Sequence, residues 1–207
     1  TLHMAAHLVR QSPLVPEMIP YDEMERWRRV YASPNVRTDF AKLFLDGVAP
    51  GFTASFTEPY LAASGYDADN HDADAILLLT PEAIAQEITE LDRRGFTVKM
   101  HAVGDNAIRR GLDGIEAARR ENGSSGLRHE IAHAPFIRIE DLGRFSVLDA
   151  VAEVSPKLWY PNPATQAQTA LLGEDRVSRC HALRDYLNAN INVTYASDWP
   201  AASPDPN

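Results

Sequence analysis

The sequence has little cysteine, no long apolar run and no excess of positive charge. Its 207 residues include one cysteine, Cys180, so an internal disulfide is excluded. The longest apolar stretch, Ala75–Leu79, is far shorter than the roughly 20 residues that a membrane-spanning helix requires. Lys and Arg total 20 against 29 Asp and Glu, and this net charge of −9 would repel a phosphate backbone. We therefore expect no binding to nucleic acid or membrane, and the lone cysteine weakly favours a cytoplasmic location.

The composition is that of a globular protein, with 44% hydrophobic and 24% charged residues. A chain of this length corresponds to a single domain over residues 1–207, or to one part of a larger domain. The first residue is Thr1 and not Met, which indicates a trimmed start or an internal piece. The expected partner is a small-molecule substrate, and no oligomeric state is indicated.

Short apolar runs alternate with helical patterns along the chain, which is typical of an α/β protein with a parallel sheet. The expected helices run from Pro81 up to Gly95, from Gly104 to about Glu121, over Ile139–Phe145 and over Glu174–Asn188, and the first two carry apolar residues at helical spacing. The expected strands are Thr38–Leu45, Phe96–His101, Leu127–His133, Ala150–Ser155 and Ile191–Ala196. Five strands joined by four crossovers are therefore predicted.

Two long connections follow strand ends, Asp46–Leu79 and Pro156–Gly173. In a parallel barrel the loops after the strands build the active site, so substrate contacts are expected there. Trp159 and Tyr160 in the second connection are candidates for lining a substrate pocket, although aromatic residues at such a place are core packing about as often.

Four chemically active residues lie at or near strand ends. Lys42 is within the first expected strand, His101 and His133 close the next two, and Asp198 follows the last. Side chains at the carboxyl ends of parallel strands converge on one mouth, and His and Asp are metal ligands. A single histidine at a strand end is more often a structural residue. Two histidines and an aspartate on different strands favour a metal site, whereas a buried, unpaired Lys42 would be costly.

Four stretches occur in the order and approximate spacing of a known family: KLFLDGV (42–48), HAVGD (101–105), RHEIAH (128–133) and SDWP (197–200). Together they resemble the amidohydrolase family 3 group, the YtcJ-like metal-dependent hydrolases. The similarity covers nearly the whole chain, and the four motifs in order are specific, whereas any one alone would be weak.

The resemblance implies an imperfect TIM (β/α)8 barrel with one or two divalent metals, commonly zinc. It makes Lys42 a carbamylated bridging ligand, His101 and His133 ligands of the second metal, and Asp198 both a ligand of the first metal and the catalytic proton shuttle. The implied activity is hydrolysis of an amide-type C–N bond, other than a peptide bond, by a metal-activated hydroxide. Two alternatives stay open: a cyclic amide or ester hydrolase on the same site, and a catalytically silent or regulatory barrel fragment.

Other polar residues receive structural interpretations. His129 is expected to lie deeper on the same strand face as His133 and to be structural. Asp105 is expected to be a helix N-terminal charge, or else to orient His101. Cys180 beside His181 is not expected to form a nucleophilic pair, because neighbours on a helix diverge.

The sequence departs from the family at its first metal ligands. Family members begin the barrel with a His-x-His pair, which this chain lacks, and His3 and His7 are four residues apart and too near Lys42. The family also continues beyond the Ser-Asp-Trp-Pro motif, whereas this chain stops at Asn207. We therefore expect a partial barrel, roughly strands four to eight with their helices, that is inactive alone.

The absence of a His-x-His pair from this chain leads to a prediction about the natural gene. A His-x-His at the end of an apolar run should be encoded some way ahead of Thr1, because those histidines would complete the first metal site. Sequencing upstream of this chain tests it. A complete gene without paired histidines there would contradict the assignment of the metal site.

Overall fold

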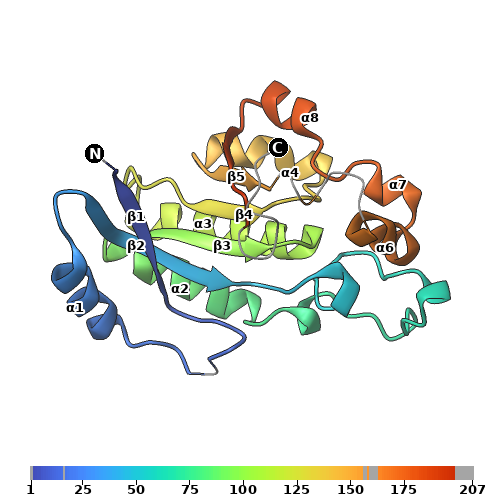
Figure 1. The fold of residues 1–207 in the computed structure, drawn as a ribbon, viewed down its shortest axis with the longest axis horizontal. Helices are drawn as coiled ribbons and strands as arrows, with labels where there is room; N and C mark the ends of the chain where they lie inside the picture. Colours follow the sequence, from blue (N-terminus) through green and yellow to red (C-terminus); the bar gives the residue numbers. More distant parts are fainter. Residues whose placement is uncertain (1, 16, 156–157, 159–162, 199–207) are drawn as a thin grey trace.

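The computed structural model describes residues 2–15, 17–155, 158 and 163–198. Six parallel strands form one sheet in the order in which they occur along the chain (Figure 1). They are β1 (Met4–Val9), β2 (Val36–Phe44), β3 (Thr97–Ala102), β4 (Glu130–His133), β5 (Val151–Val154) and β6 (Asn192–Tyr195). All their carboxyl ends therefore point to one edge of the sheet, which we call the rim.

Helices connect the successive strands. Their bounds are α1 (Tyr21–Tyr31), α2 (Pro81–Arg93), α3 (Asp105–Asn122), α4 (Ile139–Val147), α6 (Pro163–Leu172), α7 (Glu174–Val177) and α8 (Leu183–Asn188). Thr80 begins α2 with its side-chain oxygen, which accepts a hydrogen bond from the backbone N–H of Ala83, and Pro81 occupies the first turn. Within the described residues, none of these helices is both long and apolar enough to cross a bilayer.

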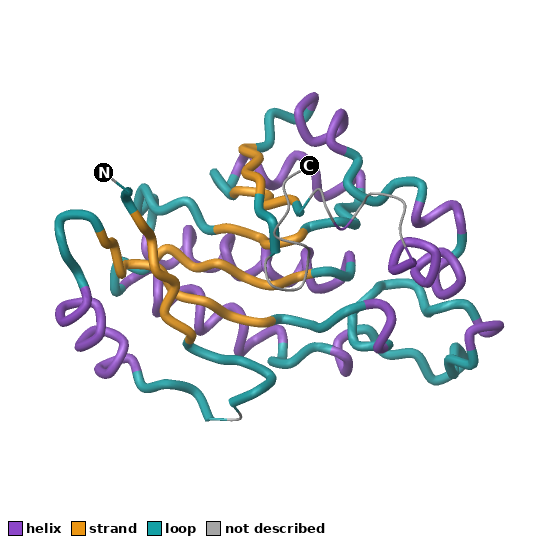
Figure 2. Tube along the Cα trace, in the orientation of Figure 1, coloured by secondary structure: helices purple, strands orange, loops and turns teal. Residues whose placement is uncertain are grey.

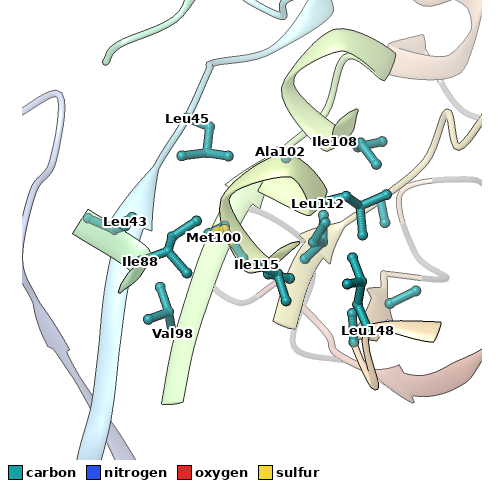
Figure 3. Close-up of a cluster of buried hydrophobic side chains, with 14 of the residues drawn as sticks. Leu43, Leu45, Ile88, Val98, Met100, Ala102, Ile108, Leu112, Ile115 and Leu148 are labelled. Carbon is teal, nitrogen blue, oxygen red and sulfur yellow. The ribbon is translucent and has the colours of Figure 1, made fainter. Parts of the chain in front are cut away.

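The main core lies between the sheet and the helices that cover one of its faces. Alternate residues of β2 and β3 point to this side because successive side chains of a strand face opposite ways. They meet the apolar faces of α2 and α3 (Figure 3), and the buried set includes Leu43, Leu45, Val98, Met100, Ile88, Ile108, Leu112 and Ile115. The intervening strand residues lie on the other side of the sheet, the inner face.

The observed strands confirm the five predicted from the sequence, with no end shifted by more than three residues. The prediction lacked β1 and α1, so the sheet has six strands and not five. The single helix expected over Glu174–Asn188 is wrong, because α7 and α8 are separate. His181 stands between them with a left-handed backbone (φ 52°), which a continuous helix does not permit.

The connection between β2 and α2 folds into three short 3-10 turns, η1 (Ala49–Gly51), η2 (Ala62–Ser64) and η3 (Asp74–Ile76). It extends beside α6, and the backbone N–H of Leu61 donates to the carbonyl of Leu171 (Figure 2). A second apolar cluster joins Phe56 and Tyr60 of this connection to Leu172 of α6. The long connection therefore has its own packed core beyond the rim.

A buried polar network lies at the opposite end of the sheet. The His129 Nδ1 atom accepts from the backbone N–H of Val98 at 3.0 Å, so Nε2 carries the proton and donates to Asp92 at 2.9 Å. Arg119 and Asn122 donate to the same carboxylate at 3.1 and 2.9 Å. Although burial alone would raise it, the hydrogen bonds from His129, Ser125 and Asn122 hold the pKa of Asp92 well below its usual range.

Replacing Asp92 tests how much this network contributes to the free energy of unfolding. Asp92→Ala should lower the free energy of unfolding in urea by about 3–5 kcal/mol, because it leaves buried donors unpaired. The partly exposed Asp113→Ala should cost less than about 1 kcal/mol. The pKa of Asp92 is depressed in the folded state, so its contribution is fully present above the unfolded pKa of about 4 and should decline progressively as the pH falls from there toward the much lower folded pKa. Equal losses in the two variants would contradict this prediction.

Candidate metal centre

The four residues predicted from the sequence lie close together at the rim. The rings of His101, at the end of β3, and His133, at the end of β4, have centroids 4.7 Å apart. His133 Nε2 is 3.9 Å from Asp198 Oδ1, beyond the end of β6. Phe44 stacks on His101 at 5.4 Å, and the Lys42 amine lies 4.8 Å from the centre of the Phe44 ring. Side chains from four strands thus meet in one place.

The backbone of His133 explains how its ring reaches the rim. Strand alternation would place His133 with Ile131, on the face covered by helices. His133 has a left-handed backbone (φ 70°), followed by another at Ala134 (φ 37°), and this turn brings the ring against His101. His129 keeps the alternation and faces the helices, where it contacts Asp92. The expectation that His129 and His133 share a face is wrong, whereas the structural role of His129 is confirmed.

Lys42 lies on the inner face beside other charged residues. Its register partner is Lys99, whose amine contacts the carboxylate of Glu153 and is 3.8 Å from that of Glu130. Among the described residues, Lys42 itself has no carboxylate within ion-pair distance. Burial and the repulsion from Lys99 lower the pKa of Lys42 to about 8. A substantial part of the amine is therefore neutral near physiological pH.

The environment of His133 favours the neutral imidazole. Its Nδ1 atom is 3.2 Å from the hydroxyl of Ser155. Burial, aided by the neighbouring His101, lowers the pKa of His133 to about 3. Burial also raises the pKa of Asp198. The neutral imidazole is the form that binds a metal ion, and the raised pKa of the carboxyl group suits an exchange of protons.

The donor atoms at the rim suit a divalent metal. Among the described residues, the Nδ1 atom of His101 is buried without a hydrogen-bond partner, and imidazole nitrogen with carboxylate oxygen is a donor set that zinc accepts. Over the part of the chain that the structure describes, however, no three His, Cys, Asp or Glu side chains form a ready ligand group. The rim residues therefore fit part of a metal centre and do not enclose a cation by themselves.

Asp46 is a site residue that the sequence analysis missed. Its Oδ1 atom lies 3.3 Å from His101 Nδ1. Asp105, which was considered for orienting His101, instead accepts from the backbone N–H of Thr57 at 2.8 Å and lies 3.5 Å from Arg138. From the sequence, Asp46 is placed only at the start of the long connection Asp46–Leu79. The position of Asp46 four residues after Lys42, at the end of a strand, is the signal that could have identified it.

The two predicted substrate contacts, Trp159 and Tyr160, lie outside the described residues. A cavity of about 220 Å³ is lined by Phe56, Phe136 and Arg138, together with residues of α4 and α7, and by none of the four rim residues. The residues that bind the substrate therefore remain a prediction.

The sequence of the chain is similar to part of two longer proteins. The chain is 30% identical over 166 residues to protein LONG AFTER FAR-RED 3 of Arabidopsis thaliana, covering 80% of this chain and 27% of that protein. It is 25% identical over 192 residues to the putative amidohydrolase YtcJ of Bacillus subtilis (strain 168), covering 91% of this chain and 34% of that protein. The chain thus spans about a third of the length of these relatives.

Solved structures share the fold. Uncharacterized metal-dependent hydrolases from Pyrococcus furiosus and Pyrococcus horikoshii OT3 match 99% of this chain with TM-scores of 0.70 and 0.73, at 22% and 21% identity. The match covers 38% and 37% of those two chains, so the six-stranded sheet corresponds to part of a larger barrel. A model of the amidohydrolase family matches residues 4–207. The chain therefore belongs to the amidohydrolase family.

Proposed function

We propose that the whole protein is a metal-dependent hydrolase that cleaves an amide-type C–N bond in an N-substituted amide or formamide. The observation that supports this most is the meeting of Lys42, His101, His133 and Asp198 at one rim, although they are spread over 157 residues of sequence. A stable fold does not require two histidines, a lysine and an aspartate to be grouped there. A hydrolytic metal centre does.

In this proposal the four rim residues hold one or two divalent cations, with zinc the first candidate. When bound, the metal lowers the pKa of water and so supplies a nucleophile near neutral pH. His101 and His133 contribute imidazole nitrogens, and Asp198 contributes a carboxylate oxygen. The stacked Phe44 restricts the motion of the His101 ring, so the donors are arranged before a cation arrives.

Lys42 becomes an oxygen ligand by reacting with carbon dioxide. The lone pair of the neutral amine adds to the carbon of CO₂ and the nitrogen loses a proton, which leaves an anionic carbamate with two oxygens. Two observations support this: the pKa of Lys42 is lowered to about 8, and no carboxylate pairs with its amine among the described residues. Lys99 does not meet the second condition, because Glu153 contacts its amine.

Asp198 moves the proton in this scheme. It accepts a proton from the attacking water as the new C–O bond forms, and it returns that proton to the nitrogen as the C–N bond breaks. Its raised pKa supports the first of these roles, because a more basic carboxylate takes a proton more readily. The products are a carboxylic acid and an amine. Trp159 and Tyr160 are proposed to contact the substrate beside this centre.

The alternatives are separated by metal content and by substrate. About two zinc ions per full-length chain would support hydrolysis, and none would support a silent or regulatory barrel. A panel of formamides, N-acyl amino acids and lactones then distinguishes a linear amide hydrolase from a cyclic amide or ester hydrolase.

Lys42→Ala in the full-length protein tests the carbamate. Activity should fall by about 100-fold or more, because this change removes a metal ligand. Mutating a residue that only supports a ligand already costs about 10–100-fold in metal affinity or activity. Formate or acetate should restore part of the bound metal and activity in Lys42→Ala, because a small carboxylate fits the vacated space. Lys42→Met is the matched control: its side chain fills the space, so neither acid should rescue it. Full metal content and activity in Lys42→Ala would refute the assignment.

A further inference from the structure

The carboxylate of Asp46 ties three segments together at the rim. Its Oδ1 atom accepts the backbone N–H of Val103 at 2.9 Å. Its Oδ2 atom accepts those of Gly104 at 2.8 Å and Ser55 at 3.0 Å. Asp46 is 1% exposed, so these hydrogen bonds replace its hydration. One side chain therefore joins the end of β2, the long connection and the turn from β3 into α3.

Ser55 continues this junction into helix α3. Its carbonyl accepts the backbone N–H groups of Asn106 at 3.1 Å and Ala107 at 3.3 Å. The N-cap residue Gly104 has no side chain to accept them, so Ser55 caps the helix from another segment. A Cβ atom at Gly104 would overlap the carbonyl of Ser55, so this close approach requires glycine.

The same carboxylate borders the ring of His101. Asp46 Oδ1 lies 3.3 Å from His101 Nδ1, a contact without the geometry of a hydrogen bond, while Phe44 stacks at 5.4 Å and His133 packs at 4.7 Å. The backbone N–H of Leu45 donates to the carbonyl of His101 at 3.0 Å, so the ends of β2 and β3 are also joined directly. The ring of His101 thus contacts Asp46, Phe44 and His133.

We propose that Asp46 is the positioning residue of this metal centre, which fixes the His101 ring and the spacing between the strand ends that carry Lys42 and His101. The proposal rests on the proposed function for its metal-binding consequence, but its structural claim holds for the metal-free protein. A carboxylate is required because both oxygens accept hydrogen bonds, and an amide would direct an NH₂ group at backbone N–H groups.

Asp92 provides a matched control at the other end of the sheet. It is also a buried carboxylate that accepts several hydrogen bonds, and it contacts one histidine, His129. Asp46→Asn and Asp92→Asn therefore remove the same charge from equally buried sites. They differ in which histidine is affected and in their distance from the rim.

The experiment is NMR of the full-length protein, labelled with ¹³C at the Cε1 atoms of its histidines. Each histidine signal is assigned from the variant that lacks that histidine. In the metal-free state, Asp46→Asn should move the His101 signal and leave that of His129 unchanged, and Asp92→Asn should do the reverse. Zn²⁺ affinity, measured below the unfolding temperature of every variant, should fall about 10–100-fold in Asp46→Asn and stay within twofold in Asp92→Asn. With Co²⁺ as the probe, only Asp46→Asn should alter the visible absorption spectrum.

Each outcome decides one claim. An unmoved His101 signal in Asp46→Asn, or an equal loss of Zn²⁺ affinity in both variants, would overturn the positioning role. A wild-type protein that binds no metal would refute the proposed function, while the histidine signals would still test the structural claim. If Asp46→Asn does not fold, Gly104→Ala disturbs the same junction without changing charge and should move the His101 signal. Gly143→Ala, with open space around its Cβ position, should not.

Discussion

The structure depends on charges that a parallel sheet has removed from water. Residues of β2 to β5 alternate between a helix-covered apolar face and an inner face that carries Lys42, Lys99, Glu130 and Glu153. Burying an isolated charge is costly, so each inner-face charge needs a partner or must become neutral. Lys99 is paired with carboxylates. Lys42 lacks such a partner among the described residues, and its lowered pKa reflects that imbalance.

Much of the rim could be predicted from the sequence because it follows from topology. The carboxyl ends of parallel strands meet at one edge, so placing the strands was enough to bring the backbones of His101, His133 and Asp198 to the same edge, although not to fix the face on which each side chain lies. β1 and α1 were not predicted. β1 is a short strand with few β-branched residues, and α1 is mostly polar with one buried residue, Met24. Weak patterns of this kind depend on tertiary contacts for their structure.

Other features of the site could not be derived from spacing. Strand alternation predicts the wrong face for His133, because a left-handed backbone, which only the folded chain reveals, turns its ring. The role of Asp46 depends on Ser55 and Gly104, which are 9 and 58 residues away in the chain. No local pattern indicates that these three segments meet. Long-range backbone contacts at the rim are therefore the part of the site that requires coordinates.

Two of the four rim residues, His133 and Asp198, have left-handed backbones with φ values of 70° and 55°. Such a conformation costs a non-glycine residue roughly 1–2 kcal/mol, and glycine would relieve it. At both positions glycine is the residue that the backbone conformation prefers. The imidazole of His133 and the carboxylate of Asp198 are therefore held at the rim against the preference of their own backbone.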